Sequence, residues 1–557
     1  MTDLKIPVGI SDFAKIRNYD YYYVDKTGLI EELLENETAE VTLITRPRRF
    51  GKTMGMSMLA NFFDIRKDSK AMFAGLQISK NAALCKEWMN QWPVVFLSFK
   101  NIDGDKFSLA YQQMVYEIGL LYDSYSELLT SNKLSEDDKA LFLQLKRRTA
   151  NEIDVLRSIQ FLLSLLYKHY GKTVILLLDE YDVPLAKSSA HGYYPDMLNV
   201  IKSMMTTSLK DNNTLRFAVI TGCLRIAKES IFTGTNNFVS DTISSSHLNE
   251  YFGFTQADVD QILKDANCME HADDIKNWYD GYHFGDLDVY CPWDVMNYLR
   301  DLQRNPKAKP ASYWKNTSDN SIIRSFIDYA GHSISRKLEI LLSGGHILQR
   351  IEENLTYDYL HSSEENLWSI LYLTGYLTQA REEDLPEPLP EGSSALMIPN
   401  AEVREIFETT IQKWFDESAQ TWNRKALFDA VWSGDTETLT KEMNKLLRKT
   451  ISYHDYREDF YHAFLAGIFA GAGYEVDSNK EHGEGRSDVV VLDPEGDRVA
   501  IFEAKYSRTQ DAMPRDCAAA LQQIEDRQYA KEFEEDYDSI LCYGIAFYKK
   551  RCLIQTK

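Results

Sequence analysis

Val41-Thr-Leu-Ile-Thr-Arg-Pro-Arg-Arg-Phe-Gly-Lys-Thr-Met54 is the stretch that decides the fold of this 557-residue chain. Its first part, Val41 to Thr45, is apolar and β-branched and predicts a buried strand. After a short loop, Gly51-Lys52-Thr53 opens a predicted helix over Met54 to Phe63. A strand, a loop and Gly-Lys-Thr at a helix N-terminus together predict a phosphate-binding loop.

Each residue of this loop has an expected task. The Lys52 ammonium would reach the β- and γ-phosphates, and the Thr53 hydroxyl would ligate Mg²⁺. The residues that we expect to bind nucleotide in this stretch are Arg48, Arg49, Phe50, Gly51, Lys52 and Thr53. The loop departs from the consensus in carrying Arg46 where glycine is usual, and Pro47 has no N–H to offer. The alternative interpretation is a basic turn between a strand and a helix.

A second predicted strand, Thr173-Val-Ile-Leu-Leu-Leu-Asp-Glu180, is continuously apolar and ends in two carboxylates. Such a run is typical of a parallel strand buried on both faces. Asp179 can hold Mg²⁺, partly through water, and Glu180 can orient the attacking water. Alone, the pattern is also that of an apolar strand that happens to end in acids. Together with the upstream loop it predicts binding of ATP or GTP.

A third strand, Leu215 to Thr221, ends in a hydroxyl where many ATPases place a polar sensor of the γ-phosphate or the lytic water. Arg225 follows and could stabilise transition-state charge in its own subunit or in a neighbouring one. The alternatives are a Thr221 hydroxyl that satisfies backbone groups and an Arg225 in a surface ion pair. Strands alternating with long helices predict an α/β fold with a parallel sheet, whose ligand lies at the carboxyl ends of the strands.

The last part of the chain predicts another α/β unit built on a hairpin. Gly485-Arg-Ser-Asp488 precedes an apolar strand, and Arg498-Val-Ala-Ile-Phe-Glu-Ala-Lys505 follows the turn. If residues 493–496 form the loop, Asp488 lies opposite Ile501 and is a diagonal neighbour of Glu503 on one face. Lys505 shares the face of Glu503. Two carboxylates so placed can share a divalent ion, with Lys505 meeting a phosphate; the alternative is an exposed charged hairpin.

The composition of the chain limits its class, its compartment and the partners that it can bind. A hydrophobic content of 44% and a charged content of 26% are ordinary for a globular protein. No signal peptide or membrane span is expected, and seven cysteines without zinc spacing fit a reducing cytoplasm. The net charge of −22 argues against a generally basic nucleic-acid coat. We expect three parts: a P-loop domain over residues 1–250, a helical lid or connector over 251–445, and over 446–557 the α/β domain that carries the hairpin.

The whole chain resembles a bacterial family of uncharacterised proteins that join an AAA-ATPase-like domain to a C-terminal PD-(D/E)XK nuclease domain. The motifs that carry the N-terminal resemblance are Tyr23-Val-Asp-Lys-Thr27, Arg46 to Thr53, Leu178-Asp-Glu-Tyr-Asp182, Thr221 to Phe232, Tyr251-Phe-Gly-Phe-Thr255 and Trp278-Tyr-Asp-Gly-Tyr282. Those of the C-terminal part are Gly485 to Asp488, Ile501 to Lys505 and Gln523 to Tyr529.

The resemblance implies a P-loop NTPase similar to archaeal and STAND-like ATPases, which often act as switches. It also implies a restriction-endonuclease-like metal site for Mg²⁺ or Mn²⁺ at Asp488 and Glu503, with Lys505 beside it. Related folds often carry a further acidic ligand on the preceding helix, here Glu458, and a glutamine downstream, here Gln523.

These expectations combine into a nucleotide-gated, metal-dependent DNA nuclease, with defence or mobile-element biology suggested by analogy alone. The alternative is an ATP-dependent switch of conformation or assembly whose nuclease-like domain binds nucleic acid without cutting it. A motor or remodelling ATPase is a third hypothesis. The expected partners are ATP and nucleic acid, with DNA preferred to RNA and no membrane; assembly into a homo-oligomer stays open.

Overall fold

A computed structural model gives the fold. It describes residues 4–35, 39–226, 231, 238–314, 337–338, 340–355, 363–386, 388–420, 425–450, 465–466, 468–469, 474–478, 481–482, 485–534, 536–549 and 551–557. The chain divides into two compact units, described in turn. The first comprises Met1–Ser318 and His346–Arg404, and the second comprises Asp319–Gly345 and Glu405–Lys557.

A five-stranded parallel sheet forms the centre of the first unit. In spatial order its strands are β2 (Val94–Ser98), β3 (Val174–Asp179), β4 (Leu215–Gly222), β1 (Val41–Thr45) and β5 (Phe238–Asp241). The register pairs Thr45 with Gly222 and Ser98 with Asp179, so the carboxyl ends of these strands meet at one edge. The parallel sheet predicted from the three sequence strands is confirmed.

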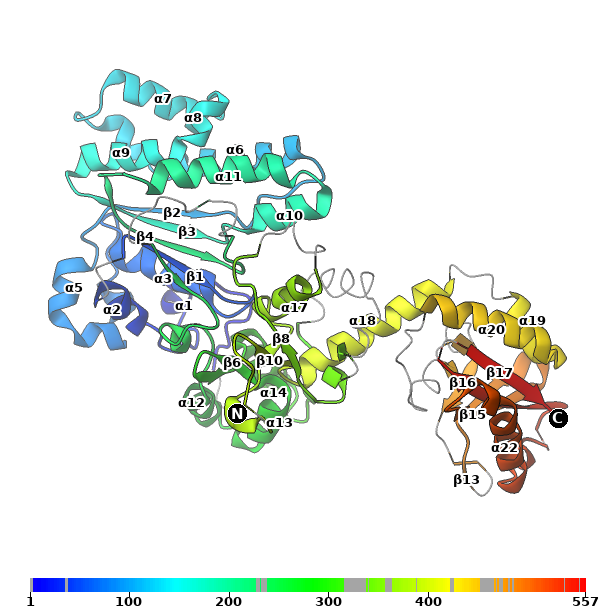
Figure 1. Cartoon of the computed structure of the whole chain (residues 1–557). Coiled ribbons are helices and arrows are strands. Elements are labelled where there is room, and N and C mark those ends of the chain that lie inside the picture. Colours follow the sequence, from blue (N-terminus) through cyan, green and yellow to red (C-terminus); the bar gives the residue numbers. More distant parts are fainter. Residues whose placement is uncertain are drawn as a thin grey trace. The chain divides into compact units, whose positions relative to one another are not determined.

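Helices cover both faces of this sheet (Figure 1). On one face lie α1 (Phe13–Asn18), α2 (Gly28–Glu35), α3 (Lys52–Phe63), α4 (Lys70–Phe73) and α5 (Ala82–Trp88). On the other lie α6 (Phe107–Asp123), α9 (Ser158–Tyr170), α10 (Val183–His191) and α11 (Tyr194–Leu209), with α7 (Glu136–Lys146) and α8 (Glu152–Leu156) outside them. The continuously apolar β3 is buried along its whole length, as a strand covered on both faces should be.

The rest of the first unit is mainly helical, as predicted, and also holds two small sheets. Its helices are α12 (Gln256–Ala266), α13 (Ala272–Tyr279), α14 (Pro292–Arg304) and α17 (Glu364–Leu373). The small sheets are the hairpin of β6 (Tyr282–Phe284) with β7 (Leu287–Val289), and β8 (Ile347–Gln349), β10 (Ser394–Met397) and β9 (Thr378–Gln379). The N-terminal segment is tied to α12, because Lys26 Nζ donates to Asp258 Oδ2 at 2.6 Å.

The second unit is built on another five-stranded sheet. Its strands in spatial order are β11 (Glu475–Ser478), β14 (Val489–Asp493), β15 (Arg498–Tyr506), β16 (Ser539–Tyr548) and β17 (Arg551–Thr556). Only the β15–β16 pair is parallel within this sheet. Helices α19 (Lys425–Ser433) and α20 (Thr436–Thr450) pack on one face, and α22 (Met513–Asp526) packs on the other. This compact unit therefore includes helices that precede residue 446.

The register of the β14–β15 hairpin differs from the predicted one by two residues. Asp493 pairs with Arg498 and Val489 with Phe502, so the connecting loop is residues 494–497. Asp493 Oδ1 accepts a hydrogen bond from Gly496 N, and Asp497 adopts a positive φ of 53°. The prediction that Asp488 lies opposite Ile501 is wrong, because Ile501 pairs with Val490. Asp488 precedes the paired residues of β14, and its Oδ2 accepts a hydrogen bond from Ala504 N at 2.7 Å. Asp488 therefore lies beside the part of β15 that carries Glu503.

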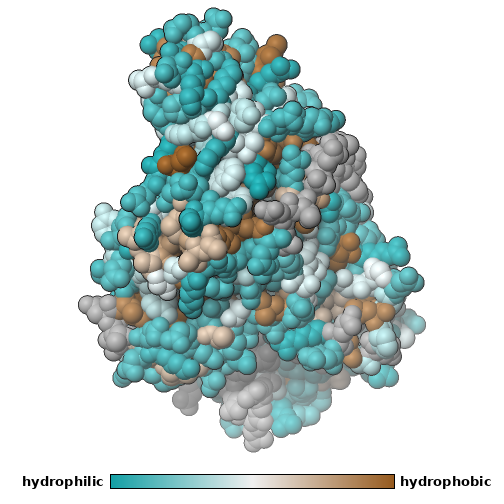
Figure 2. Space-filling view, turned by 90° about the vertical axis from the view of Figure 1, so that its left-hand side faces the viewer, coloured by the Kyte–Doolittle hydropathy of each residue, from teal (hydrophilic) through white to brown (hydrophobic). Residues whose placement is uncertain are grey.

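The outer edge of β17 is closed by α20. The Asn444 side chain both donates to the Cys552 carbonyl oxygen and accepts from its N–H, each at 2.9 Å, as a neighbouring strand would. One helical turn away, Thr440 Oγ1 accepts from Ile554 N at 3.1 Å. The face of the molecule in Figure 2 is mostly hydrophilic, with apolar residues in scattered patches. Among the described helices, none has the length and apolar character needed to cross a membrane.

Candidate functional site

The predicted phosphate loop joins the end of β1 to the N-terminus of α3. Gly51 adopts a φ of 86° and precedes the first helical residue, Lys52. A left-handed conformation at this position favours glycine because it has no Cβ. The loop therefore directs the N–H groups of the first turn of α3 outward, as an anion site requires.

Arg46, which replaces the usual first glycine, is buried and anchors the loop. Its guanidinium forms an ion pair with Asp241 at the end of β5 and donates to Asn249 Oδ1 at 2.9 Å. It also lies over the Phe252 ring, 5.4 Å from the centroid. The sequence offered no role for Arg46, because both polar partners lie about two hundred residues downstream. The contacts of the Arg46 side chain therefore hold the loop in place, whereas the consensus glycine has no side chain to make them.

Lys52 is buried at the centre of the loop. Its Nζ donates to the carbonyl oxygens of Arg46 and Pro47, each at 2.9 Å, and lies 3.7 Å from the Cys223 sulfur. Carbonyl oxygens are replaceable partners for an ammonium, so this lysine can turn to an incoming phosphate without leaving an unpaired charge. The ring of Phe50 packs on Tyr282 and Phe284, with centroids 4.9 and 5.1 Å apart, so Phe50 supports the loop from the protein interior.

Asp179 is the centre of a hydrogen-bond network at the sheet edge. Thr53 Oγ1 donates to its Oδ2 at 3.0 Å and Ser98 Oγ donates to the same oxygen at 3.2 Å. Thr221 Oγ1 donates to Oδ1 at 2.7 Å. The structure therefore brings together Thr53, Asp179 and Thr221, which the sequence placed on three separate elements. A hydroxyl beside a carboxylate is a suitable oxygen donor pair for Mg²⁺.

Glu180 lies next to Asp179 in a strained conformation, with φ of 53°. Burial raises the pKa of its carboxyl, and the nearby Lys52 charge opposes that rise. Asp182, two residues on, is buried and accepts hydrogen bonds from Cys223 N at 2.9 Å and Leu224 N at 3.0 Å. It thereby fixes the turn after β4 that leads to Arg225, whose side chain is half-buried. Arg48 is exposed on the loop, close enough for its charge to act on Glu180.

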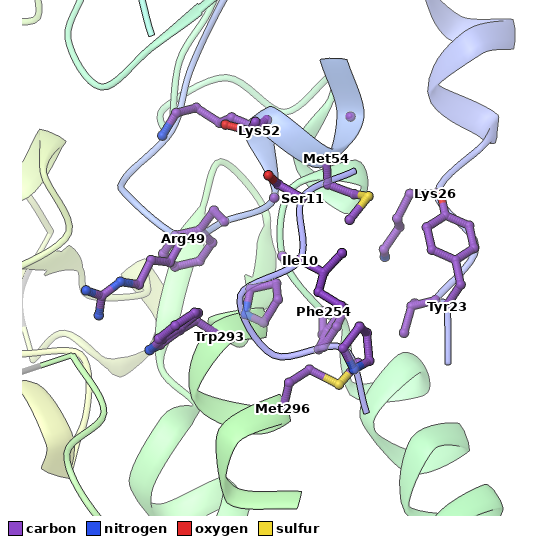
Figure 3. Close-up of a pocket in the computed structure, with 18 of the residues that line it drawn as sticks. Ile10, Ser11, Tyr23, Lys26, Arg49, Lys52, Met54, Phe254, Trp293 and Met296 are labelled. Atoms are coloured by element: carbon purple, nitrogen blue, oxygen red, sulfur yellow. The ribbon is translucent and has the colours of Figure 1, made fainter. Parts of the chain in front are cut away.

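A cavity of ≈ 330 Å³ opens beside the α3 N-terminus. Gly51 to Gly55 and Glu180 line its phosphate-loop end, while segments 7–11 and 22–26 line another wall. Its apolar lining includes Ile10, Met54, Phe254, Trp293 and Met296 (Figure 3). This volume lies in the range of small-molecule pockets. The sequence predicted no role for these wall residues, although the Tyr23 to Thr27 and Tyr251 to Thr255 motifs include or adjoin some of them.

Arg49 links this cavity to a buried pair of acids. Its guanidinium lies over the Trp293 ring at 5.1 Å (Figure 3), and its Nη1 donates to the Tyr313 carbonyl oxygen at 3.5 Å. Behind it, Asp294 of α14 and Glu402 of α18 (Ala401–Gln420) are both buried. Burial, together with the neighbouring Asp294 carboxylate, raises the pKa of Glu402, so the pair keeps a proton. Glu402 Oε1 also accepts from Trp314 N at 2.7 Å.

A second candidate site lies at the end of the β14–β15 hairpin. Asp488 Oδ2 accepts from Ala504 N at 2.7 Å, which holds its carboxylate against β15. Lys505 Nζ donates to Glu503 Oε1 at 2.9 Å; Glu503 is buried, and the side chain of Lys505 is 28% exposed. Two carboxylates and a partly exposed lysine side chain therefore lie together at this end of the hairpin.

The donor set is suitable for a divalent metal. Mg²⁺ commonly uses one or two carboxylates and completes its shell with water and phosphate oxygens. Within the described residues, no group of three or more His, Cys, Asp or Glu is arranged as an all-protein metal site. Glu458, the predicted further ligand, lies outside the described residues. Gln523 lies half-buried on α22, which covers the face that carries Glu503.

Comparison with known proteins gives two family matches. Residues 7–232 match a family model described as predicted AAA-ATPase, and residues 456–557 match the PD-(D/E)XK nuclease superfamily. The chain is also 26% identical over 572 residues to "Uncharacterized protein in vnfD 5'region" of Azotobacter chroococcum mcd 1. That similarity covers 98% of this chain and 97% of the relative. The family resemblance expected from the sequence is confirmed.

Proposed function

We propose that this chain, which joins an AAA-ATPase-like domain to a domain of the PD-(D/E)XK nuclease superfamily, is a nucleotide-controlled, metal-dependent nuclease. The observation that carries the nucleotide half is the cavity that connects the α3 N-terminus to an apolar wall. The observation that carries the nuclease half is that Asp488 accepts a hydrogen bond from Ala504 N, between Glu503 and Lys505, whose side chains form an ion pair.

ATP would bind with its phosphates at the α3 N-terminus and its base in the apolar part of the cavity. Lys52 would exchange its carbonyl partners for phosphate oxygens, and the N–H groups that follow Gly51 would donate to the same phosphates. Thr53 and Asp179 would hold Mg²⁺, which neutralises phosphate charge. The base would contact side chains such as Phe254 and Met296, which lie away from the loop in Figure 3.

Hydrolysis of ATP is supported by the carboxylates at the edge of the sheet. Glu180 faces the cavity beside Lys52, where a carboxylate can accept a proton from attacking water. Thr221 holds Asp179 through a 2.7 Å hydrogen bond, and Arg225 follows on the turn fixed by Asp182. A bound γ-phosphate would act on Thr221 through its hydrogen bond to Asp179, and on Arg225 through the turn that Asp182 fixes.

Cleavage of nucleic acid would take place at the second site. Asp488 and Glu503 would hold Mg²⁺ or Mn²⁺, which supplies a hydroxide nucleophile and offsets charge on the phosphate. Lys505 would orient the scissile phosphate and stabilise its developing charge, because its side chain is partly exposed and its ammonium is held beside Glu503. Glu458 and Gln523 are proposed as supporting groups. DNA is the proposed substrate.

The test is a cleavage assay on single- and double-stranded DNA with Mg²⁺ or Mn²⁺, each with and without ATP. Wild type is compared with Lys52→Ala, Glu503→Ala and Lys80→Ala, the last as an exposed lysine control on the first unit. Cutting should be lost in Glu503→Ala, altered in its ATP dependence in Lys52→Ala, and unchanged in Lys80→Ala.

Other outcomes separate the two halves of the proposal. Cutting that persists in Glu503→Ala would remove the metal site from the mechanism. Wild type that cuts nothing under any metal, yet changes its mass or shape with ATP, would instead establish a non-cleaving switch. ATP binding that is the same in wild type and Lys52→Ala would overturn the nucleotide site.

A further inference from the structure

A groove lies in the second unit, beside the end of the sheet that carries Lys505. It has a volume of ≈ 610 Å³ and is formed by α20, the α22 N-terminus and β17. The side chains that give it character are polar or basic: Lys441, Asn444, Lys445, Gln510 and Arg551. None of the sequence motifs described above includes a residue that lines this groove.

The strand register fixes the groove relative to the catalytic motif. Lys505 pairs with Ala546 of β16, and Ala546 pairs with Leu553 of β17, which lines the groove. Two strand spacings separate Lys505 from Leu553, which is roughly 10 Å. Arg551 precedes Leu553 by two residues and so lies on the same sheet face and at the same end. The groove therefore begins about 10 Å from the proposed cleavage site.

The basic side chains are held by specific contacts. Arg551 Nη1 donates to Gln510 Oε1 at 3.0 Å, and both residues line the groove. Lys441 and Lys445 are one turn apart on α20, on either side of the position where Asn444 binds the β17 backbone. Lys445 also pairs with Glu442. In the part of the chain that the structure describes, neither Lys441 nor Arg551 forms a salt bridge with an acidic group.

We infer that this groove binds the phosphate backbone of the nucleic acid that Lys505 presents for cleavage, an inference that rests on the proposed nuclease function. Each strand of a duplex carries one phosphate per ~3.4 Å of axis, so a separation of roughly 10 Å spans about three phosphates. The backbone would pass from Lys505 over the N-terminal end of α22, whose Met513 and Cys517 cover Ala546 between the strands, and then past Arg551 to Lys441 and Lys445. In a chain with net charge −22, a local basic groove is what allows a polyanion to approach.

The test measures binding of a fluorescein-labelled DNA duplex and of the corresponding single strand by anisotropy at several salt concentrations. It uses the full-length chain with Glu503→Gln, so that binding is read without cutting. To this background are added Lys441→Gln, Lys445→Gln and Arg551→Gln together. The matched control carries Arg527→Gln, Lys531→Gln and Lys557→Gln, three exposed cations beyond the other end of the same sheet.

The groove variant should bind DNA about tenfold or more weakly at low salt, and its slope of log affinity against log salt should fall by about 0.9 per lost duplex contact. The control should match its parent. Equal binding by the groove and control variants would overturn the inference. Failure of the proposed nuclease function gives a different result, because the wild type would then cut no substrate while the groove variant still showed weaker binding.

Cleavage provides a second readout on the otherwise wild-type chain. The groove variant should raise KM for DNA while leaving kcat within about twofold, since uniform binding is removed and the reacting groups are intact. A fall in kcat with unchanged KM would contradict backbone binding by these residues.

Discussion

Arg46 and Asp241 form an ion pair in which both side chains are buried, and it ties the phosphate loop to the end of a strand nearly two hundred residues downstream. The residue that makes this loop look imperfect in sequence is therefore its structural anchor. A glycine there would give the loop a consensus sequence and remove every one of these contacts.

Substituting Arg46→Gly should destabilise the protein by about 3–5 kcal/mol, because it leaves the Asp241 carboxylate buried without its cation. It should not tighten ATP binding. Urea denaturation and calorimetric ATP titration measure the two effects. The double variant Arg46→Met with Asp241→Asn should lose less than the sum of the single variants, since the two residues interact directly. Strict additivity would argue against the pair as the source of stability.

Filling the cavity should separate base binding from phosphate binding. Ile10→Trp places a larger side chain against Phe254 and Met296, so ATP affinity should fall by about tenfold or more, which is about 1.4 kcal/mol per factor of ten. Binding of inorganic triphosphate should be unchanged, because the α3 N-terminus is not altered. Tyr19→Trp, at an exposed position of the same N-terminal segment, is the control. An equal loss for both ligands would show that the cavity does not hold the base.

Glu180→Gln should retain ATP binding and reduce ATP hydrolysis by about 10²–10⁴-fold, the usual contribution of a general base. Since burial raises the pKa of Glu180, wild-type hydrolysis should decline on acidification at a higher pH than an ordinary glutamate, with pKa about 4.3, would give. Steady-state phosphate release across pH measures both effects. Hydrolysis that is unchanged in the variant would remove Glu180 from the reaction.

The buried pair of Asp294 and Glu402 should make stability depend on pH. The raised pKa of Glu402 means that the folded state keeps a proton that the unfolded state releases above about pH 4.3. Stability is therefore full below that pH and is lost as pH rises toward the folded pKa. Glu402→Gln retains an oxygen for Trp314 N–H but cannot ionise, so its stability should vary less with pH.

Thermal unfolding of wild type, Glu402→Gln and Glu408→Gln from mildly acidic to alkaline pH measures this difference. Glu408 is exposed on the same helix and should behave as wild type. Parallel pH profiles for wild type and Glu402→Gln would mean that the pair does not retain its proton.

Local patterns predicted much of the fold and of the first site. The strand from Val41 to Thr45 agrees with β1, and β3 ends at Asp179 with Glu180 directly after it. These features were predictable because apolar runs and Gly-Lys-Thr are signals within one segment. The cavity wall could not be predicted in the same way. Ile10, Phe254 and Trp293 come from three distant segments, and nothing in a single sequence states that these segments meet.

The register of the β14–β15 hairpin shows another limit of prediction from the sequence. Four residues connect β14 to β15, as predicted, yet the loop begins one residue later because Asp493 caps the turn and Asp497 accepts the left-handed conformation. The predicted turn placed Asp488 opposite Ile501, whereas Ile501 pairs with Val490 in the structure. The pairing depended on turn geometry that the residue types permit in more than one form.

The side-chain amide of Asn444 has a consequence for self-association. An unprotected edge strand can recruit a strand from another molecule and so seed aggregates. At β17, Asn444 and Thr440 already use backbone groups that such a strand would need. Asn444→Ala should therefore leave backbone groups of β17 unpaired and allow them to bond a strand of another molecule. In the natural chain, Asn444 and Thr440 prevent this intermolecular strand pairing at β17.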